Sequence, residues 1–179
     1  MNFLLSLYAH FIMFFPGAVG SRLRYSYWKK RLNYIGDNAY LSSGIEIGEP
    51  KLLKIGNNFI LGRDSVVSAT GCEGIYIGDD VSIARGTYMH GANHRFDSLD
   101  IPVNKQGLTF KTIIFKENKY SIVIEDDVWI GSNSVILSGT HLSTGCIVSA
   151  GTVVSGSYPA YSILIGNPAR LTGTRKKHI

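Results

Sequence analysis

Two histidines lie four residues apart in a short polar segment, residues 90–97, with the sequence HGANHRFD. An imidazole exchanges a proton near neutral pH, so a histidine beside a binding site can act as a general base. Amide and carboxylate side chains nearby can hydrogen-bond a hydroxyl group or orient the histidine. We predict proton transfer at His94, with His90, Asn93 and Asp97 as contacts to the molecule that loses the proton. The alternative for His90 is a surface residue without a chemical role.

The histidine segment precedes a stretch without a regular pattern. Residues 96–121 are largely polar and include Asp97, Asp100, Pro102 and Gly107. Loops of this length inside a compact domain are usually functional or disordered. We therefore predict a loop extruded from the fold over about residues 96–121, with His94 at its mouth.

The strands that must position this segment are predicted by a six-residue repeat that follows it. An aliphatic residue recurs at every sixth position, at Ile124, Ile130, Ile136, Leu142, Val148 and Val154. Neither a helix of period 3.6 nor a single strand of period 2 requires such spacing. Short strands that turn a corner every six residues do require it, and three such hexads close a coil of 18 residues. The pattern predicts a parallel β-helix, a solenoid built from hexapeptide repeats.

The same period continues upstream with short insertions, through Ile35, Leu41 and Ile47 and on to Met89. The register predicts roughly five coils, and we assign residues 34–160 to the β-helix. Glycines that follow an aliphatic residue directly mark corners that need either a positive φ or room for neighbouring backbone. An ordinary β-sandwich would instead show turn signals every 8–12 residues.

The amino-terminal segment, residues 1–33, has a different character. Residues 3–15 are almost wholly apolar, and residues 1–31 carry five basic residues and no acid. The apolar stretch is shorter than the roughly 20 residues that span a bilayer, and it lacks the features of a signal peptide. We predict a helical cap on the open end of the solenoid. The alternative is a segment that rests on the inner face of a membrane.

Composition limits the remaining possibilities. The chain has 179 residues, a net charge of +5 and two cysteines, Cys72 and Cys146, in different repeats. One domain fits this length, and the cysteines form neither a disulfide framework nor a metal motif. We expect a cytoplasmic protein without a metal site. The basic ends suit an anionic partner, but no nucleic-acid-reading element is present.

Together, the hexads, residues 128–131 (VWIG), residues 166–170 (GNPAR) and the histidine-bearing break resemble the hexapeptide-repeat acyltransferases. Among these, the chain looks most similar to the sugar and polysaccharide O-acetyltransferases. The resemblance covers about residues 16–175. It implies a left-handed β-helix, acetyl-CoA as co-substrate, His94 as the general base, and a homotrimer with each active site between two subunits.

The resemblance also implies a donor-binding side. Trp129 matches a tryptophan that lines the acyl-CoA channel, and Ser132 and Ala150 lie one coil apart where the pantetheine arm runs. The segment around residues 166–170 matches the cover over the adenine end. The residues expected to bind the donor are Trp129, Ser132, Ala150, Asn167, Pro168, Arg170, Arg175 and Lys176. Many relatives carry Lys-Asp where this chain has Gly156-Ser157, so the basic tail, residues 170–179, is expected to replace a phosphate contact.

Within this family the expected reaction is O-acetylation of a sugar hydroxyl in a surface polysaccharide or its precursor. The alternative acceptor is a small soluble molecule such as a galactoside, an amino sugar, serine or a xenobiotic. A second alternative is a β-helix scaffold without activity, which would leave the loop and His94 unexplained. A γ-class carbonic anhydrase would need three histidines around a metal ion, and His90, His94 and His141 are poorly spaced for that.

Overall fold

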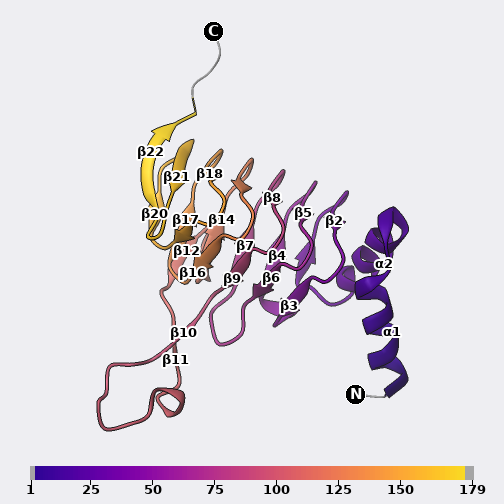
Figure 1. Ribbon diagram of the computed structural model, residues 1–179, viewed down its shortest axis with the longest axis horizontal. Helices are drawn as coiled ribbons and strands as arrows, with labels where there is room; N and C mark the ends of the chain where they lie inside the picture. Colours follow the sequence, from indigo (N-terminus) through magenta and orange to yellow (C-terminus); the bar gives the residue numbers. More distant parts are fainter. Residues whose placement is uncertain (1–2, 176–179) are drawn as a thin grey trace.

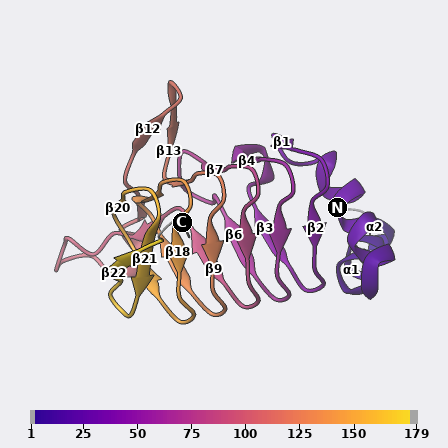
Figure 2. The ribbon, with the colours of Figure 1, turned by 90° about the horizontal axis from the view of Figure 1, so that it is seen from above.

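The computed structural model describes residues 3–175 and is a left-handed parallel β-helix with two helices at its amino-terminal end (Figure 1). Its coils stack along one axis, so that their strands form three sheets of mainly parallel strands, which we call walls A, B and C (Figure 2). Five complete coils and a partial sixth confirm the fold predicted from the hexads, and the strand order follows the chain within each wall.

Each wall takes one strand from every coil. Wall A comprises β1 (Tyr34–Ile35), β4 (Leu53–Ile55), β7 (Ile75–Ile77), β14 (Ile122–Ile124), β17 (Thr140–Leu142) and β20 (Ser157–Tyr158). Wall B comprises β2 (Tyr40–Leu41), β5 (Ile60–Leu61), β8 (Ser82–Ile83), β15 (Trp129–Ile130), β18 (Ile147–Val148), β21 (Ser162–Ile165) and the antiparallel β22 (Arg170–Thr174). Wall C comprises β3 (Glu46–Gly48), β6 (Val66–Ser68), β9 (Tyr88–His90), β16 (Val135–Leu137) and β19 (Val153–Val154).

The hexad residues form the core. All six aliphatic residues from Ile124 to Val154 are fully buried, at 0% exposure. Directly after the insertion the coil has 18 residues, because Ile122 pairs with Thr140 and Ile130 with Val148. The last, partial coil is two residues shorter, since Ile147 pairs with Ile163. Burial of this continuous aliphatic column is the main stabilising contribution, at roughly 25 cal/mol for each Å² of apolar surface removed from water.

Small residues occupy the corners for two physical reasons. The Ser134 and Thr140 hydroxyls are buried and donate to the carbonyls of Gly131 and Leu137, at 2.8 and 2.7 Å, so each satisfies a corner carbonyl. Gly131 is required by crowding, since a Cβ there would lie 2.5 Å from the Ala150 nitrogen. Positive φ angles instead fall two residues later, at Asn133 among others.

Helices α1 (Phe3–Phe14) and α2 (Gly17–Lys29) cap the first coil. Arg24 is 1% exposed and donates to Leu41 O on β2 and to Ile12 O and Phe15 O at the end of α1, at 2.8, 3.0 and 2.8 Å. These bonds satisfy carbonyls at the negative end of α1. Burial lowers the pKa of Arg24 from its usual value, and the side chain joins both helices to the solenoid.

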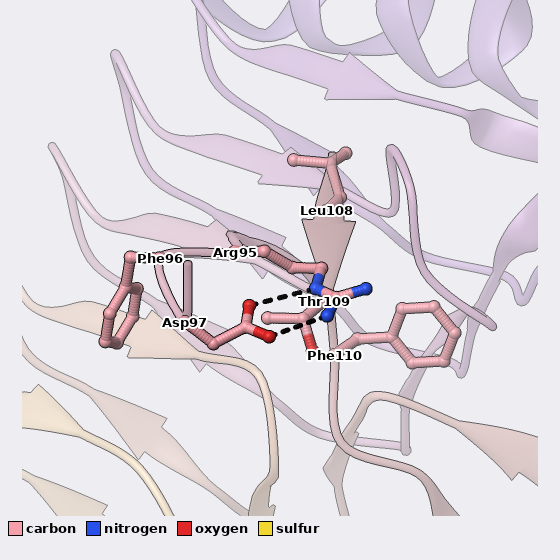
Figure 3. A pocket seen from close by; sticks show the side chains of 6 residues that line it. All are labelled: Arg95, Phe96, Asp97, Leu108, Thr109 and Phe110. Carbon is pink, nitrogen blue, oxygen red and sulfur yellow. Dashed lines mark hydrogen bonds and ion pairs between the residues drawn. The ribbon is translucent and has the colours of Figure 1, made fainter. Parts of the chain in front are cut away.

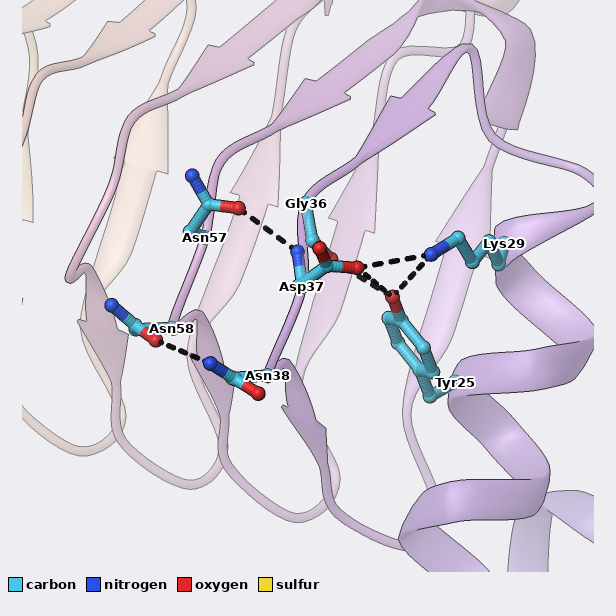
Figure 4. A network of polar contacts seen from close by, with 7 residues as sticks. All are labelled: Tyr25, Lys29, Gly36, Asp37, Asn38, Asn57 and Asn58. Carbon is cyan, nitrogen blue, oxygen red and sulfur yellow. Dashed lines mark hydrogen bonds and ion pairs between the residues drawn. The ribbon is translucent and has the colours of Figure 1, made fainter.

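A second group of polar contacts docks α2 on the corner between walls A and B. The Tyr25 hydroxyl donates to Gly36 O at 3.1 Å, and Lys29 forms an ion pair with Asp37 at 3.1 Å (Figure 4). Asp37 continues into a corner ladder, where its amide donates to Asn57 Oδ1 at 2.9 Å. No helix within residues 3–175 is long and apolar enough to cross a membrane.

Three details differ from the sequence-based boundaries. The insertion leaves the solenoid directly after β9, not at residue 96, and it has two parts. The first contains the ribbon of β10 (Asn93–His94) and β11 (Leu108–Thr109) and the 3₁₀ helix η2 (Val103–Lys105). The other 3₁₀ helix among the described residues, η1 (Pro50–Leu52), lies outside the insertion and precedes β4. The second is the hairpin of β12 (Ile113–Phe115) and β13 (Asn118–Tyr120). Wall B also continues through Ile165, beyond the expected end at residue 160.

The β12–β13 hairpin stands on wall A and is held by aromatic residues. Phe115 and Tyr120 lie 5.1 and 5.6 Å from the Tyr76 ring on β7, centroid to centroid. Lys116 donates to the Tyr76 hydroxyl at 3.0 Å. These contacts join residues about 40 positions apart in the chain. Because they hold only the second part of the insertion on wall A, the single loop expected from the sequence is divided into a projecting ribbon and a packed hairpin.

Candidate active site

Where the insertion interrupts the hexad register, a pocket lies along the edge of wall C at which its strands end. His94 lies on β10, the first strand outside the solenoid, and its Cα partner on β11 is Leu108. The pocket has a volume of about 460 Å³. We call it the histidine pocket; it is lined by Thr70, Tyr88, His90, Ala92, Asn93, His94, Leu108 and Leu137.

His94 and His90 differ in how they are held. His94 is exposed, and within residues 3–175 its imidazole forms no hydrogen bond. His90 is half-buried, and its Nδ1 lies 2.9 Å from Ala92 O and 3.2 Å from Ala92 N. The His90 ring also stacks on Tyr88, with centroids 5.8 Å apart and planes 15° apart. His94 therefore has a ring free to meet a substrate, whereas the orientation of His90 is fixed.

Asp97 lies outside the histidine pocket. Its carboxylate accepts two hydrogen bonds from Arg95, Nε to Oδ1 at 3.1 Å and Nη2 to Oδ2 at 2.7 Å (Figure 3). The hydrogen bonds from Arg95 lower the pKa of Asp97. The pair lines a neighbouring pocket of about 480 Å³ together with Phe96, Thr109 and Phe110, and Leu108 borders both pockets. Asp97 thus orients Arg95, and within residues 3–175 it forms no hydrogen bond with His94.

Trp129 and Arg175, both expected to bind the donor, line one pocket on wall B. Trp129 is 54% exposed, and both residues line a pocket of about 350 Å³ beside Asp127. Arg175 Nη1 lies 2.7 Å from Asp127 Oδ2 and donates to Gly145 O at 3.1 Å. Arg175 reaches this pocket because its amide donates to Tyr161 O, which places it just beyond the end of β22.

The other predicted donor residues lie farther along the same wall. Ser132 and Ala150 occupy equivalent turns of consecutive coils, and Ser132 O accepts from the amide that follows Ala150 at 2.8 Å. Asn167 and Pro168 form the turn between β21 and β22, and Arg170 begins β22. Lys176 lies outside the described residues.

The two halves of the predicted site do not meet within one chain. The histidine pocket uses β9, β10 and β16, whereas the Trp129 pocket uses β8, β15 and β18 on wall B, and the two share no lining residue. Each wall faces outward from the triangular solenoid. A molecule bound at Trp129 of one chain is therefore on a different face from His94 of that chain.

Sequence reasoning missed several residues of the histidine pocket. Tyr88 alternates with the buried Thr87 and Met89 and is 44% exposed, so the period of two within β9 identifies it as outward-facing. Thr70, Leu108 and Leu137 come from three separate segments and carry no such signal. Within residues 3–175 no group of three or more histidine, cysteine, aspartate or glutamate side chains is arranged to hold a metal ion.

Comparison with known proteins agrees with this architecture. The family described as "Hexapeptide repeat of succinyl-transferase" matches residues 53–89 and 121–155, the coils on either side of the insertion. A "Probable acetyltransferase" of Mycobacterium tuberculosis is 34% identical over 124 residues, which are 69% of this chain and 38% of that protein. A "Probable macrolide acetyltransferase" of Lysinibacillus sphaericus is 38% identical over 108 residues, 56% of this chain and 60% of that protein.

Solved structures extend the similarity over the whole solenoid. A hexapeptide-repeat acetyltransferase from Vibrio cholerae, complexed with acetyl coenzyme A, has a TM-score of 0.73 and 25% identity, covering 97% of this chain and 90% of that one. A galactoside acetyltransferase in complex with coenzyme A shares the fold, with a TM-score of 0.75, 23% identity and coverage of 95% and 78%. The chain spans less than two thirds of the length of the two curated relatives. On its coils, its histidine-bearing insertion and these similarities, the chain is a hexapeptide-repeat protein that is similar to the acetyltransferases built on this fold.

Proposed function

We propose that the protein is an acetyl-CoA-dependent O-acetyltransferase that modifies a sugar hydroxyl of a surface polysaccharide or its precursor, with His94 as general base. The observation that carries the proposal is the free His94 imidazole at the edge of the histidine pocket. The pocket joins an imidazole to an apolar and aromatic lining, including Tyr88 and Leu137. That combination suits a sugar ring, whose faces are apolar and whose edge carries hydroxyls.

In this mechanism His94 accepts the proton of the acceptor hydroxyl as the oxygen attacks the thioester carbonyl. A C–O bond forms and the C–S bond breaks, and His94 returns the proton to the departing thiolate. General base catalysis of this kind contributes about 10²–10⁴ in rate.

The neighbouring residues have supporting roles. His90, fixed by Ala92 and Tyr88, offers its remaining ring nitrogen to a second hydroxyl of the acceptor. Asn93 offers amide hydrogen bonds beside it. Asp97 acts through Arg95, which borders the adjoining pocket and is suited to an anionic part of the acceptor such as a phosphate.

On the donor side, Trp129 lines the pantetheine channel, and the turns at Ser132 and Ala150 let it approach the backbone closely. Asn167, Pro168 and Arg170 cover the adenine end. Arg175 and Lys176 supply charge for the phosphates. Support comes from the coenzyme A and acetyl coenzyme A bound in the two similar structures, and from the exposed ring of Trp129 beside Arg175.

Because the two halves of the site lie on different faces of one chain, we infer a cyclic homotrimer. In this assembly the histidine pocket of one subunit meets the Trp129 wall of its neighbour. We further infer that the enzyme works in the cytoplasm, since Cys72 and Cys146 are free thiols, as expected in a reducing compartment.

The proposal is tested by measuring acetyl-CoA consumption across nucleotide-sugars and oligosaccharide fragments, with the products identified by mass spectrometry. We expect turnover on a carbohydrate and a mass increase equal to one acetyl group on oxygen. Donor binding without turnover on any carbohydrate would contradict the sugar acceptor. Absence of donor binding would favour the alternative of a scaffold without activity.

One observation favours a second acceptor class. The relative from Lysinibacillus sphaericus is named for macrolides, and Tyr88, Leu108 and Leu137 give the histidine pocket an apolar lining. A small soluble acceptor such as a macrolide or another xenobiotic is therefore the alternative. It predicts turnover on such compounds at concentrations that leave polysaccharide fragments unmodified.

A further inference from the structure

Helix α1 presents an apolar surface that no other part of residues 3–175 covers. Leu7, Tyr8, Phe11 and Phe14 are each 57–58% exposed, and the helix contains no charged residue. Apart from Ser6 and His10 the side chains of α1 are apolar or aromatic, and a helix of this kind normally packs against a protein or a membrane. An exposed group of large apolar side chains marks an interaction surface.

This surface belongs to a helix that is firmly held at its carboxyl-terminal end. There Ile12 is 2% exposed, and its carbonyl accepts a hydrogen bond from the buried Arg24 at 3.0 Å. Arg24 also donates to Phe15 O and to Leu41 O of β2. These bonds fix α1 on α2 and the first coil, while Leu7, Tyr8, Phe11 and Phe14 remain exposed.

The charged residues of the two helices and of the turn after them are all positive, because the chain contains no acid from residue 1 to residue 36. Arg22, Lys30 and Arg31 are exposed on α2 and directly after it. None of these three forms an ion pair within residues 3–175, whereas Lys29 is paired with Asp37. An exposed apolar helix followed by a basic one is complementary to the acyl chains and headgroups of an anionic lipid layer.

The position of α1 separates this partner from a second copy of the chain. The helices lie at the amino-terminal end of the stack, opposite β20–β22, and α1 extends away from the first coil (Figure 1). The sites that require a neighbouring subunit lie on the walls, around coils three to five. A subunit packed along the walls leaves the outer side of α1 open.

We propose that α1 docks the protein on an anionic membrane surface, lying parallel to it with Phe11 and Phe14 in the interface and Arg22, Lys30 and Arg31 against the headgroups. The proposal does not depend on the catalytic assignment. It brings the solenoid to a surface where a lipid-anchored molecule would be reached, whatever group the enzyme transfers.

The test is flotation of the purified protein with vesicles of phosphatidylcholine alone or of phosphatidylcholine mixed with about one third phosphatidylglycerol, which gives the surface a negative potential. We expect wild-type protein to float with the anionic vesicles and to be released by high salt. The variant F11D/F14D should bind at least ~10-fold more weakly, because charges replace the two aromatic side chains that would enter the lipid layer. Charge removal in R22Q/K30Q/R31Q should weaken binding to anionic vesicles only.

A matched control uses exposed apolar residues elsewhere. Leu99, in the projecting ribbon, and Ile114, on β12, are 101% and 76% exposed, and L99D/I114D introduces the same charge far from α1. This control should float like wild type. Equal loss in both double variants, or no binding of wild-type protein to anionic vesicles, would overturn the proposal. A change of molar mass in solution for F11D/F14D alone, without vesicle binding by wild type, would identify a second copy as the partner.

Discussion

Two histidines of this protein, one on the ribbon and one on wall A, show how position in the solenoid decides what a side chain can do. His94 lies on β10, outside the coils, and its exposed ring borders a pocket. His141 lies on β17 within wall A, and its Nε2 is 2.7 Å from Glu125 Oε1. Both are histidines near the insertion in three dimensions, yet only one has a ring free for chemistry.

The environment of His141 is complete without a ligand. Glu125 Oε2 accepts hydrogen bonds from the Thr144 amide and hydroxyl at 3.1 and 3.0 Å. Phe115 of the β12–β13 hairpin contacts the His141 ring edge-on, with centroids 5.6 Å apart. The side chains of His141 and Glu125 are only 23% and 22% exposed. A histidine in the regular register thus becomes part of the wall, and one that leaves the register becomes available to a substrate.

The largest predicted effect concerns His94. H94A should lower kcat by about 10²–10⁴, because proton transfer develops in the transition state, and should leave acetyl-CoA binding and molar mass unchanged. Steady-state kinetics, donor titration and light scattering measure these quantities. A loss of thermal stability with near-normal turnover would instead assign His94 a structural role.

H141A is predicted to show the opposite behaviour. It leaves the Glu125 carboxylate without its imidazole partner and removes the contact with Phe115, at a cost of about 1–2 kcal/mol. For a domain of this size we expect a Tm lower by about 2–8 °C, with kcat unchanged. Differential scanning calorimetry and kinetics on the same preparation compare the two variants. Loss of turnover at unchanged Tm would place His141 in the catalytic site.

H90A lies between these extremes. The His90 ring is held by Ala92 and Tyr88 and contributes one free nitrogen to the acceptor. We therefore expect kcat/KM to fall about 10-fold, mainly because KM for the acceptor rises. The measurement is kcat and KM for the best acceptor found in the screen. Should H90A abolish turnover while H94A remains active, the two assignments must be exchanged.

The smallest effect is the pH dependence of the Glu125 pair. Burial raises the pKa of Glu125, but hydrogen bonds from His141 and Thr144 outweigh it, and the net pKa is lowered from 4.5. A carboxylate with a lowered folded-state pKa stabilises the fold above its unfolded pKa, and this contribution is lost as pH falls through the folded value. E125Q should therefore be less stable than wild type near pH 7, and the difference should shrink below about pH 4.5. Chemical denaturation at both pH values tests this; a constant difference would exclude the ionised carboxylate as its cause.

The sequence predicted the regular part of this protein well. Within a coil, each core position is determined by residues six apart, and the interior is uniformly apolar, so Ile124 through Val154 identify the fold without any long-range information. The break in that period also predicted an insertion next to His94, although the insertion begins directly after β9 and includes His94 on β10. Trp129 and Arg175 were expected on one side of the site, and the fold brings them to one pocket.

Other features required the tertiary structure, because they depend on contacts between segments that no short pattern relates. Arg24 was one of five basic residues in the amino-terminal segment, and only the docking of α1 and α2 on β2 buries it among carbonyls. The pairing of Asp97 with Arg95 and the packing of the hairpin on Tyr76 likewise depend on chain directions within the insertion. The hexad period determines what faces the interior. Which outward-facing side chains meet is decided by how the irregular segments cross the walls. For that reason the sequence proposed His94 as a candidate, and only the structure shows which residues line the pocket beside it.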